Sequence, residues 1–279
     1  MSSPEFYSNA QAYDIAFSDR NFVDECNFLD YCLKTYGAIG TPRGGRSADH
    51  RQSFLELACG PGRHAQEFAG RGWRAVGLDL SPEMLEYARS IEVLANRPVS
   101  WHAADMCDFA LEEPVTLAAN LMESLSHLTT NERVVNHLRA VSSNLVSGGI
   151  FVIEMAHPDT IWRDSLPNSW RSKSTENSAF CKISPIEVDV LFGAADDHYD
   201  WVDQIWTVTT RLEIHEEGKP SRVVESKYPH RWYQAQELRA LIDLSEAFSK
   251  TWFLGNMVIP PPLLDNSEKS QRMVVVLRK

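Results

Sequence analysis

The stretch FLELACGPGRHA, residues 54–65, changes from an apolar run to a glycine turn within two residues. Its apolar half has the length of one buried strand, and Gly-Pro-Gly is a strong turn signal. The segment GRHAQEFAGRG that follows has a helical pattern and closes on Gly72. We therefore expect a strand, a tight turn and a helix here, which is the repeating unit of open α/β sheets.

The same alternation of apolar runs and helical segments continues to residue 156. The apolar runs are almost uninterrupted, as is typical of parallel strands that are covered on both faces. Ser81 and Pro82 also give the second helix a strong start signal. The pattern predicts an α/β fold with a Rossmann-like, doubly wound, seven-stranded sheet. Its further segments are WRAVGLDL (73–80), SPEMLEYARSI (81–91), VSWHAAD (99–105), VTLAANLM (115–122), NERVVNHLRAVSSNLVSGG (131–149), IFVIEMA (150–156), QAQELRALIDLSEAF (234–248) and the last strand RMVVVLRK (272–279).

The alternation of apolar runs and helical segments ends at residue 156, and the sequence divides the chain into three parts. Residues 1–36 are predicted to form an N-terminal helical lid. Residues 37–156 and 231–279 are expected to form the core that binds the ligand. Residues 157–230 contain long β-rich runs and a hairpin signal, EEGKP, and predict an antiparallel β-rich flap inserted after the fifth strand, above the substrate pocket.

Composition excludes several classes of function. The chain has 279 residues and a net charge of −11, a sign that repels nucleic acid. It contains no apolar run long enough to span a membrane, and its N-terminus lacks the pattern of a secretory signal, so we expect a cytoplasmic protein. Five cysteines without CxxC spacing make a disulfide framework or a structural metal site unexpected. The partner that fits best is a small molecule, and a homodimer is compatible with the sequence.

The glycine turn is poorly built for phosphate. Gly60 and Gly62 allow the backbone to come close to a ligand where a Cβ atom would collide. The dinucleotide signature GxGxxG would place glycines at three positions that are Ala58, Gly60 and Arg63 here, so the signature is incomplete and lacks its third glycine. A P-loop is absent as well, because no Gly-Lys-Ser/Thr follows the turn.

Acidic and small residues at every second position indicate a different ligand for the turn. Glu56, Ala58, Gly60 and Gly62 resemble the motif of class I S-adenosylmethionine (SAM) methyltransferases. Asp79 stands seventeen residues after Gly62, at the end of the next predicted strand. In this family an acid at that place accepts hydrogen bonds from both ribose hydroxyls, a geometry shared with other Rossmann folds.

The resemblance implies SAM as the cofactor and assigns its remaining contacts. Asp105 would accept the adenine amino group, and the backbone amide of Met106 would contact the ring. Arg20 would pair with the methionine carboxylate, although an ion pair with Asp24 is the alternative. The other residues expected around the cofactor are Leu80 and Met84, on either side of the adenine, and Asn120.

Within this superfamily the chain resembles small-molecule N-methyltransferases that dimethylate amino sugars. Four segments carry the resemblance: YSNAQAYDIAFSDR (7–20), ESLSHL (123–128), HPDTIWRDSLPNSW (157–170) and RWYQAQELRALI (231–242). The chain departs from that pattern at Glu123, where the family has a small polar residue, and at Asn120, where it has a Cys or similar. The methyl acceptor, and whether the transfer goes to N or O, therefore stay open.

Methyl transfer from a sulfonium is expected to be an in-line displacement, for which the protein holds the nucleophile in place and excludes water. His127 is the expected base, because a histidine titrates near neutral pH, although it could instead cap a turn. Tyr7 could hold the acceptor or simply pack. Glu123 could bind a cationic acceptor or be a solvated loop acid.

Aromatic residues and a further histidine are the predicted substrate contacts. His157 follows the fifth strand and could serve either the substrate or a turn. Aromatic walls hold apolar or cationic substrates well, although some of these rings must belong to the core. Two functions other than methyl transfer stay open: a non-methylating reaction that uses the same cofactor, and an inactive ligand-binding domain. The full set of substrate candidates is Tyr13, His157, Trp162, Trp206 and Trp232.

Overall fold

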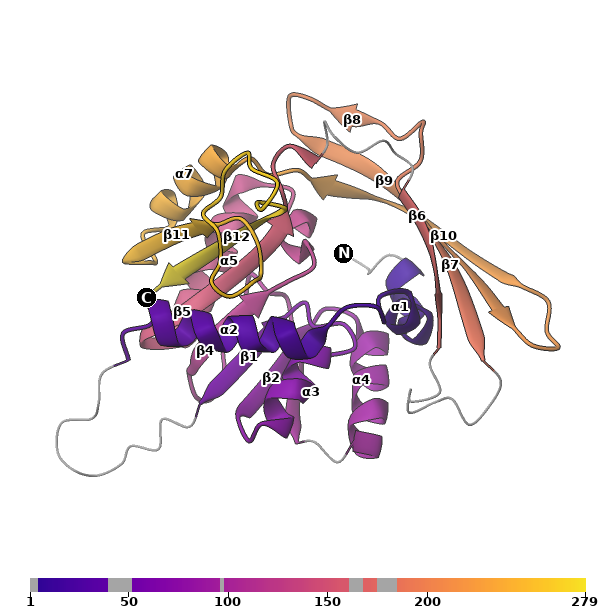
Figure 1. Ribbon diagram of the computed structural model, residues 1–279, viewed down its shortest axis with the longest axis horizontal. Coiled ribbons are helices and arrows are strands. Elements are labelled where there is room, and N and C mark those ends of the chain that lie inside the picture. The colour runs from indigo at the N-terminus through magenta and orange to yellow at the C-terminus, as the bar shows by residue number, and fades with distance from the viewer. Residues whose placement is uncertain (1–4, 40–51, 96–97, 161–167, 175–184) are drawn as a thin grey trace.

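The computed structural model describes residues 5–39, 52–95, 98–160, 168–174 and 185–279. Its core is one seven-stranded sheet in the order β11-β12-β5-β4-β1-β2-β3 (Figure 1). This arrangement confirms the predicted α/β fold and its doubly wound sheet. The strands are β1 (Ser53–Leu57), β2 (Arg74–Asp79), β3 (Val99–Ala103), β4 (Val115–Asn120), β5 (Leu145–Ala156), β11 (Lys250–Leu254) and β12 (Arg272–Arg278).

The core sheet is parallel except for β12, which runs antiparallel to both of its neighbours. The sequence pattern predicted a parallel sheet and did not foresee this reversal. Its cause is the connection between β11 and β12, residues 255–271, which contains no helix, so the chain turns back instead of crossing over.

Helices cover both faces of this sheet. Alternate residues of β1 point to opposite faces, so Phe54 packs with α2 and α3 while Leu55 and Leu57 pack with α5 and α7. No helix in the described part of the chain is long and apolar enough to cross a membrane. The helices are α1 (Ala10–Ala16), α2 (Phe22–Tyr36), α3 (Arg63–Gly70), α4 (Pro82–Ala95), α5 (Asn131–Ser143) and α7 (Ala235–Ser245), with short 3-10 turns η1 (Glu5–Ser8) and η2 (Ser124–His127).

A second, antiparallel sheet follows β5, as the β-rich runs predicted. Its order is β10-β9-β7-β6, with β8 paired to β9. Figure 1 shows it as a separate layer beside the core, with α1 between it and α4. Phe6 and Ile15 pack on its inner face against Val188 and Leu212. Its strands are β6 (Asn168–Lys173), β7 (Ile186–Phe192), β8 (Tyr199–Asp200), β9 (Ile205–Glu216) and β10 (Arg222–Arg231).

A buried histidine ties β1 to α2 and α3. His64 Nδ1 lies 2.7 Å from Glu56 Oε1, and its Nε2 lies 2.6 Å from Glu25 Oε2. The other oxygen of Glu56 accepts the Ala65 N–H at 2.8 Å. Burial alone lowers the pKa of His64, but the two carboxylates outweigh it and raise that pKa from 6.5 to about 9. His64 is therefore a cation between two carboxylates at neutral pH.

Gly62 also has a packing role that the sequence did not indicate. Its φ is +68°, and a Cβ atom there would lie 2.2 Å from the Trp101 ring. The same ring excludes a Cβ atom at Gly77, at 2.4 Å. Both glycines thus make room for the Trp101 indole, whose N–H donates to Glu92.

The His64 bridge predicts a specific loss of stability at alkaline pH. Because the folded pKa is raised, the folded protein keeps a proton that the unfolded chain releases between pH 6.5 and about 9. The free energy of unfolding should fall over this window, by about 3 kcal/mol from this group. Urea unfolding at pH 6.5 and pH 9 measures the fall. His64→Gln should be less stable at pH 6.5 and should lack this part of the decline; an equal decline in the variant would contradict the assignment.

The Trp101 contact predicts that Gly62→Ala destabilises the protein more than Gly72→Ala. Both glycines have positive φ, but nothing lies within 4 Å of a Cβ atom at Gly72. Gly72→Ala should cost about 1–2 kcal/mol for backbone strain alone. Gly62→Ala should cost a further ~1–3 kcal/mol for the displaced indole. Denaturant unfolding of both variants checks this difference, and equal losses would show that Trp101 does not constrain the turn.

Candidate functional site

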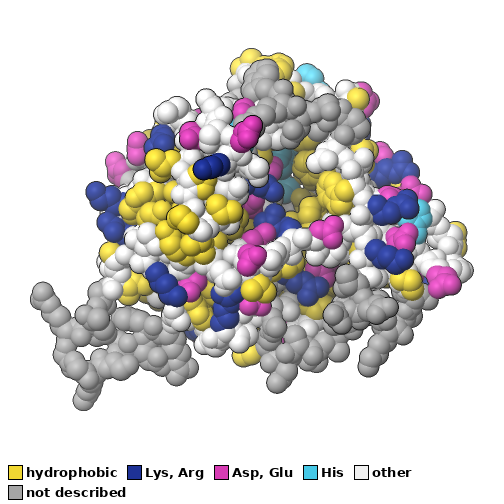
Figure 2. All heavy atoms as spheres, viewed as in Figure 1, with side chains coloured by type: hydrophobic (Ala, Val, Ile, Leu, Met, Phe, Trp, Pro, Cys, Tyr) yellow, Lys and Arg dark blue, Asp and Glu magenta, His cyan; other side chains and the backbone are white. Residues whose placement is uncertain are grey.

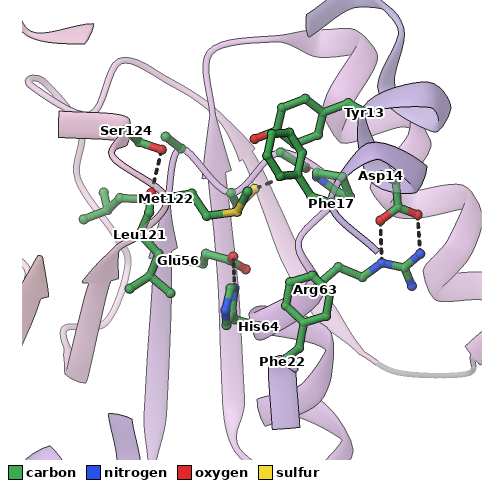
Figure 3. A pocket seen from close by; sticks show the side chains of 15 residues that line it. Tyr13, Asp14, Phe17, Phe22, Glu56, Arg63, His64, Leu121, Met122 and Ser124 are labelled. Carbon is green, nitrogen blue, oxygen red and sulfur yellow. Dashed lines mark hydrogen bonds and ion pairs between the residues drawn. The ribbon is translucent and has the colours of Figure 1, made fainter. Parts of the chain in front are cut away.

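A pocket opens at the carboxyl end of β1, beneath α1 and beside the segment that follows β4 (Figure 3). The space among its lining residues is about 460 Å³ when the open solvent at its mouth is included. Its position agrees with the rule that open α/β sheets bind ligands beyond the carboxyl ends of their strands. The lining residues are Tyr13, Asp14, Phe17, Phe22, Glu56, Leu57, Ala58, Cys59, Gly60, Pro61, Arg63, His64, Leu121, Met122 and Ser124.

Gly60 lies at the rim of this pocket, and Asp79 holds it there. The Gly60 N–H donates to Asp79 Oδ2 at 2.7 Å, and the Ser81 N–H donates to Oδ1 at 2.8 Å. A Cβ atom at Gly60 would meet nothing nearer than Tyr13 at 3.7 Å and Met84 at 3.9 Å. Gly60 thus presents bare backbone to the pocket. Burial raises the pKa of Asp79 in spite of these hydrogen bonds.

Arg20 lies among carboxylates rather than beside Asp24. Its Nη2 is 2.9 Å from Glu25 and 3.5 Å from Glu154. Burial lowers the pKa of Arg20, but Glu154 and Glu25 outweigh it and raise that pKa. The Nε atom of Arg20 is buried and has no hydrogen-bond partner among the described residues. One guanidinium donor therefore remains available.

The remaining residues predicted around the cofactor lie at or just beyond the ends of β2, β3 and β4, except Met84, which lies in the first turn of α4. Asp105 binds Arg133 at 2.9 Å and accepts the Cys107 N–H at 2.9 Å. Burial would raise the pKa of Asp105, but these hydrogen bonds lower it. The remaining members differ in exposure and pairing: Leu80 is exposed, Met84 and Met106 are buried, and Asn120 is buried with its Nδ2 3.3 Å from Met106 Sδ and its Oδ1 without a partner among the described residues.

The backbone beyond β4 is strained at two consecutive residues. Met122 and Glu123 have φ values of +54° and +60°, which side chains other than glycine rarely adopt. Glu154 holds this turn in place, because its Oε2 accepts the Met122 N–H at 2.7 Å and its carbonyl accepts the Glu123 N–H at 3.2 Å. Strain of this kind persists only where the surroundings enforce it, and it concentrates at functional sites.

The structure brings His127 and Tyr7 together. The Tyr7 hydroxyl lies 2.9 Å from His127 Nε2 and 3.3 Å from the hydroxyl of Tyr228 on β10. Burial, together with nearby His230, lowers the pKa of His127 from 6.5 to about 3. The expectation that His127 titrates near neutral pH is therefore wrong, and the ring is uncharged there. Glu123 is not hydrogen-bonded to this pair; its carboxylate lies 3.8 Å from His230 and 3.7 Å from Arg272.

Some of the residues predicted to contact the substrate lie at the site, and others make contacts only within the surrounding structure. Tyr13 lines the pocket, and its ring centroid is 5.7 Å from that of Tyr7. Trp206 is buried beside Tyr228. His157 instead uses both ring nitrogens within the chain, on Asp159 and on the Asp265 carbonyl, as its alternative role in a turn implied.

Two predicted substrate residues remain. The Trp232 indole N–H donates to the Pro158 carbonyl at 3.4 Å. Trp162 lies outside the described residues.

Several residues of this site were not singled out from the sequence. Tyr228 and His230 stand two positions apart on β10, and strand alternation could have placed them on one face. Asp14 stands in the segment 7–20 that carries the resemblance, but no role was assigned to it: it binds Arg63 of α3 and the Tyr87 hydroxyl of α4, at 2.7 Å and 2.9 Å, and so holds α1 over the pocket. Figure 3 shows this ion pair beside the pocket.

Groups in and beside the pocket match what the cofactor implied by the motif would need, although Arg20 and Asp79 do not themselves line the pocket. A zwitterionic amino acid joined to a nucleoside needs a cation for its carboxylate, a carboxylate for its ribose and bare backbone between them. Arg20 Nε is an unused buried donor, Asp79 has lone pairs beyond its two backbone contacts, and Gly60 leaves the required space.

Comparisons with known proteins agree with this fit. Residues 54–149 match the family described as "Methyltransferase domain". A dTDP-3-amino-3,4,6-trideoxy-alpha-D-glucopyranose N,N-dimethyltransferase of Streptomyces venezuelae is 30% identical over 102 residues, which are 37% of this chain and 41% of the relative. A dTDP-4-amino-2,3,4,6-tetradeoxy-D-glucose N,N-dimethyltransferase of Saccharopolyspora spinosa is 33% identical over 103 residues, 37% of this chain and 40% of the relative. The matches thus span about two fifths of these relatives.

The fold is shared over a greater length. The crystal structure of Streptomyces venezuelae DesVI has a TM-score of 0.68 and 19% identity, with 96% of this chain and 97% of that chain covered. At this identity the likeness shows the fold alone. Residues 54–149 of this chain are thus similar to a methyltransferase domain, and sugar N,N-dimethyltransferases are among the proteins that this part of the chain resembles.

Proposed function

We propose that this protein transfers a methyl group from SAM to the amine of a small polar molecule of the amino-sugar type. The observation that carries the proposal is the contact between two sites. Tyr13 lines the pocket at Gly60, and its ring also packs against Tyr7, whose hydroxyl is bonded to His127. The pocket at Gly60 is therefore next to a cluster of aromatic side chains with hydrogen-bonding groups, and there we place the proposed acceptor chamber. The amino-sugar specificity of the relatives supports the amine.

Charge and exposed backbone determine how the pocket would hold the cofactor. We assign the methionine carboxylate to Arg20 and the ribose hydroxyls to Asp79, with Gly60 backbone between them. Asp105 and the Met106 amide remain the proposed adenine contacts. When bound, SAM supplies an electrophilic methyl group carried on a positively charged sulfur. The proposed reaction geometry is an in-line displacement at that methyl group.

The acceptor would lie in the chamber that Tyr7, His127 and Tyr228 form. An ammonium has no lone pair, so the amine must bind unprotonated or lose its proton at the site. With a pKa of about 3, His127 does not retain such a proton near neutral pH. We therefore propose that His127 orients the Tyr7 hydroxyl, and that this hydroxyl accepts an N–H of the amine and aims its lone pair.

Glu123 would stabilise the charge that methylation leaves on the acceptor nitrogen. Its side chain is 24% exposed, so it is partly desolvated, and a carboxylate there favours a nearby cation. The aromatic rings of the chamber add cation–π attraction and exclude water. Glu123 is thus the proposed electrostatic partner of the product ammonium.

Gly60→Val should abolish detectable SAM binding, because the side chain would occupy the space that the cofactor requires. Strain at φ +49° should cost only about 1–2 kcal/mol of stability, so the variant should still fold. Isothermal titration calorimetry with SAM measures the loss, which we expect to exceed ~100-fold. Gly72→Val is the matched control, with a positive φ and no ligand contact, and it should bind normally. Unchanged SAM affinity in Gly60→Val would contradict the proposed approach of the cofactor to the Gly60 backbone.

His127→Asn should lower kcat about 10- to 100-fold through lost positioning and should leave the shape of the pH–rate profile unchanged. The reason is that an imidazole with a pKa of about 3 does not titrate between pH 5.5 and 9. Steady-state rates with the best amine acceptor across this range provide the comparison, and Tyr7→Phe should behave alike. A wild-type inflection near pH 6.5 that disappears in His127→Asn would instead establish His127 as the base.

A radiolabelled-methyl transfer screen tests the proposal as a whole. The acceptors are dTDP-linked 3-amino and 4-amino sugars, matched sugars with a hydroxyl in place of the amine, and simple alkylamines. We expect transfer to amino sugars and none to the hydroxyl analogues. Transfer to the hydroxyl analogues alone would assign O-methylation, and SAM binding without transfer to any of these acceptors would contradict the proposed function.

A further inference from the structure

His230 stands out as a buried polar side chain without a hydrogen-bond partner. It is 3% exposed, and neither ring nitrogen has a hydrogen-bond partner among the described residues. A buried imidazole left in this state destabilises the fold, since its desolvation is not repaid by a hydrogen bond. Such groups are rare in native proteins, and each calls for an explanation, of which a partner supplied by another molecule is one.

The position of His230 identifies the molecule that would supply that partner. It lies on β10 two residues after Tyr228, so both side chains point to the same face of the second sheet. Tyr228 on that face reaches the Tyr7 hydroxyl at 3.3 Å. The His230 ring centroid is 5.7 Å from that of His127. His230 therefore borders the proposed acceptor chamber from the side opposite the core sheet.

The surroundings of His230 are aromatic on several sides and acidic on one. Its ring packs edge-to-face against Phe192, Trp206 and His127. Glu123 Oε2 lies 3.8 Å from His230 Nε2, which is too far for a hydrogen bond. A ligand atom near both groups could bond to either. Figure 2 shows histidine and basic side chains within the hollow between the two layers of the molecule.

We propose that His230 binds a hydroxyl group of the methyl acceptor and so selects a hydroxylated amine, such as an amino sugar, over a simple alkylamine. This inference rests on the proposed function. The two ring nitrogens of a histidine can each take part in a hydrogen bond, and a hydroxyl can both donate and accept one. Glu123 then faces the amine, while the aromatic rings around His230 contact the apolar carbons of the sugar ring. In this arrangement the second sheet selects the methyl acceptor, and the core sheet binds the cofactor.

His230→Phe separates this role from a structural one. Because the native ring has no hydrogen bond to lose, the melting temperature of the variant should be unchanged or higher, and its SAM affinity by calorimetry should stay within about 2-fold. His137→Phe is the control, since His137 is equally buried and its Nδ1 bonds the Met106 carbonyl at 2.8 Å. That change should lower the melting temperature by about 3 °C or more.

The kinetic experiment compares two methyl acceptors. One is dTDP-3-amino-3,6-dideoxy-glucose, and the other is cyclohexylamine, which carries an amine on a six-membered ring without hydroxyl groups. In His230→Phe the KM for the amino sugar should rise about 10-fold or more, and the preference over cyclohexylamine should shrink by the same factor. An unchanged preference, or a clear loss of stability in His230→Phe, would overturn the inference. Wild-type protein that binds SAM and methylates neither amine would overturn the proposed function, and the role of His230 would fail with it.

Discussion

The bridge from Glu56 through His64 to Glu25 is the constraint on which the site depends. It joins the first strand of the sheet to the helix that follows the glycine turn and to α2. Glu25 in turn binds Arg20, and Arg20 reaches Glu154, whose carboxylate fixes the strained turn at Met122. One buried chain of charges therefore sets the glycine turn, the available guanidinium donor and the backbone beyond β4. A buried charge in this chain is tolerated only because each carboxylate faces a cation or a backbone N–H.

In this arrangement the two sheets would bind different molecules, the core sheet the cofactor and the second sheet the acceptor. In the proposed function, the core sheet binds the nucleoside and amino-acid parts of the cofactor beside Gly60 and Asp79. The second sheet presents Tyr228 and His230 from the opposite side. The N-terminal segment lies between them, held by Asp14 on Arg63 and by the packing of Phe6 on the second sheet. If the proposed acceptor site is right, changes in the second sheet should alter the acceptor without disturbing the cofactor pocket.

Much of this could be predicted from the sequence, for physical reasons. Uninterrupted apolar runs and helix start signals define a parallel sheet, and the alternation at Glu56, Ala58 and Gly60 locates the turn. The role of Gly62 was not predictable, because its restriction comes from Trp101 on another strand. The pKa of His127 was not predictable either, since it depends on burial and on His230, about a hundred residues later in the chain. Contacts between distant segments leave no local pattern.

The central claim is that bare backbone at Gly60, the Asp79 carboxylate and the free donor of Arg20 together form the SAM site. A crystal structure of the protein soaked with S-adenosylhomocysteine, the product form of the cofactor, tests this most directly. The nucleoside should lie against Asp79 with its ribose hydroxyls, and the amino acid carboxylate should lie against Arg20 Nε. Saturating ligand that leaves this pocket empty, or that binds elsewhere with Arg20 still facing only Glu25 and Glu154, would contradict the claim.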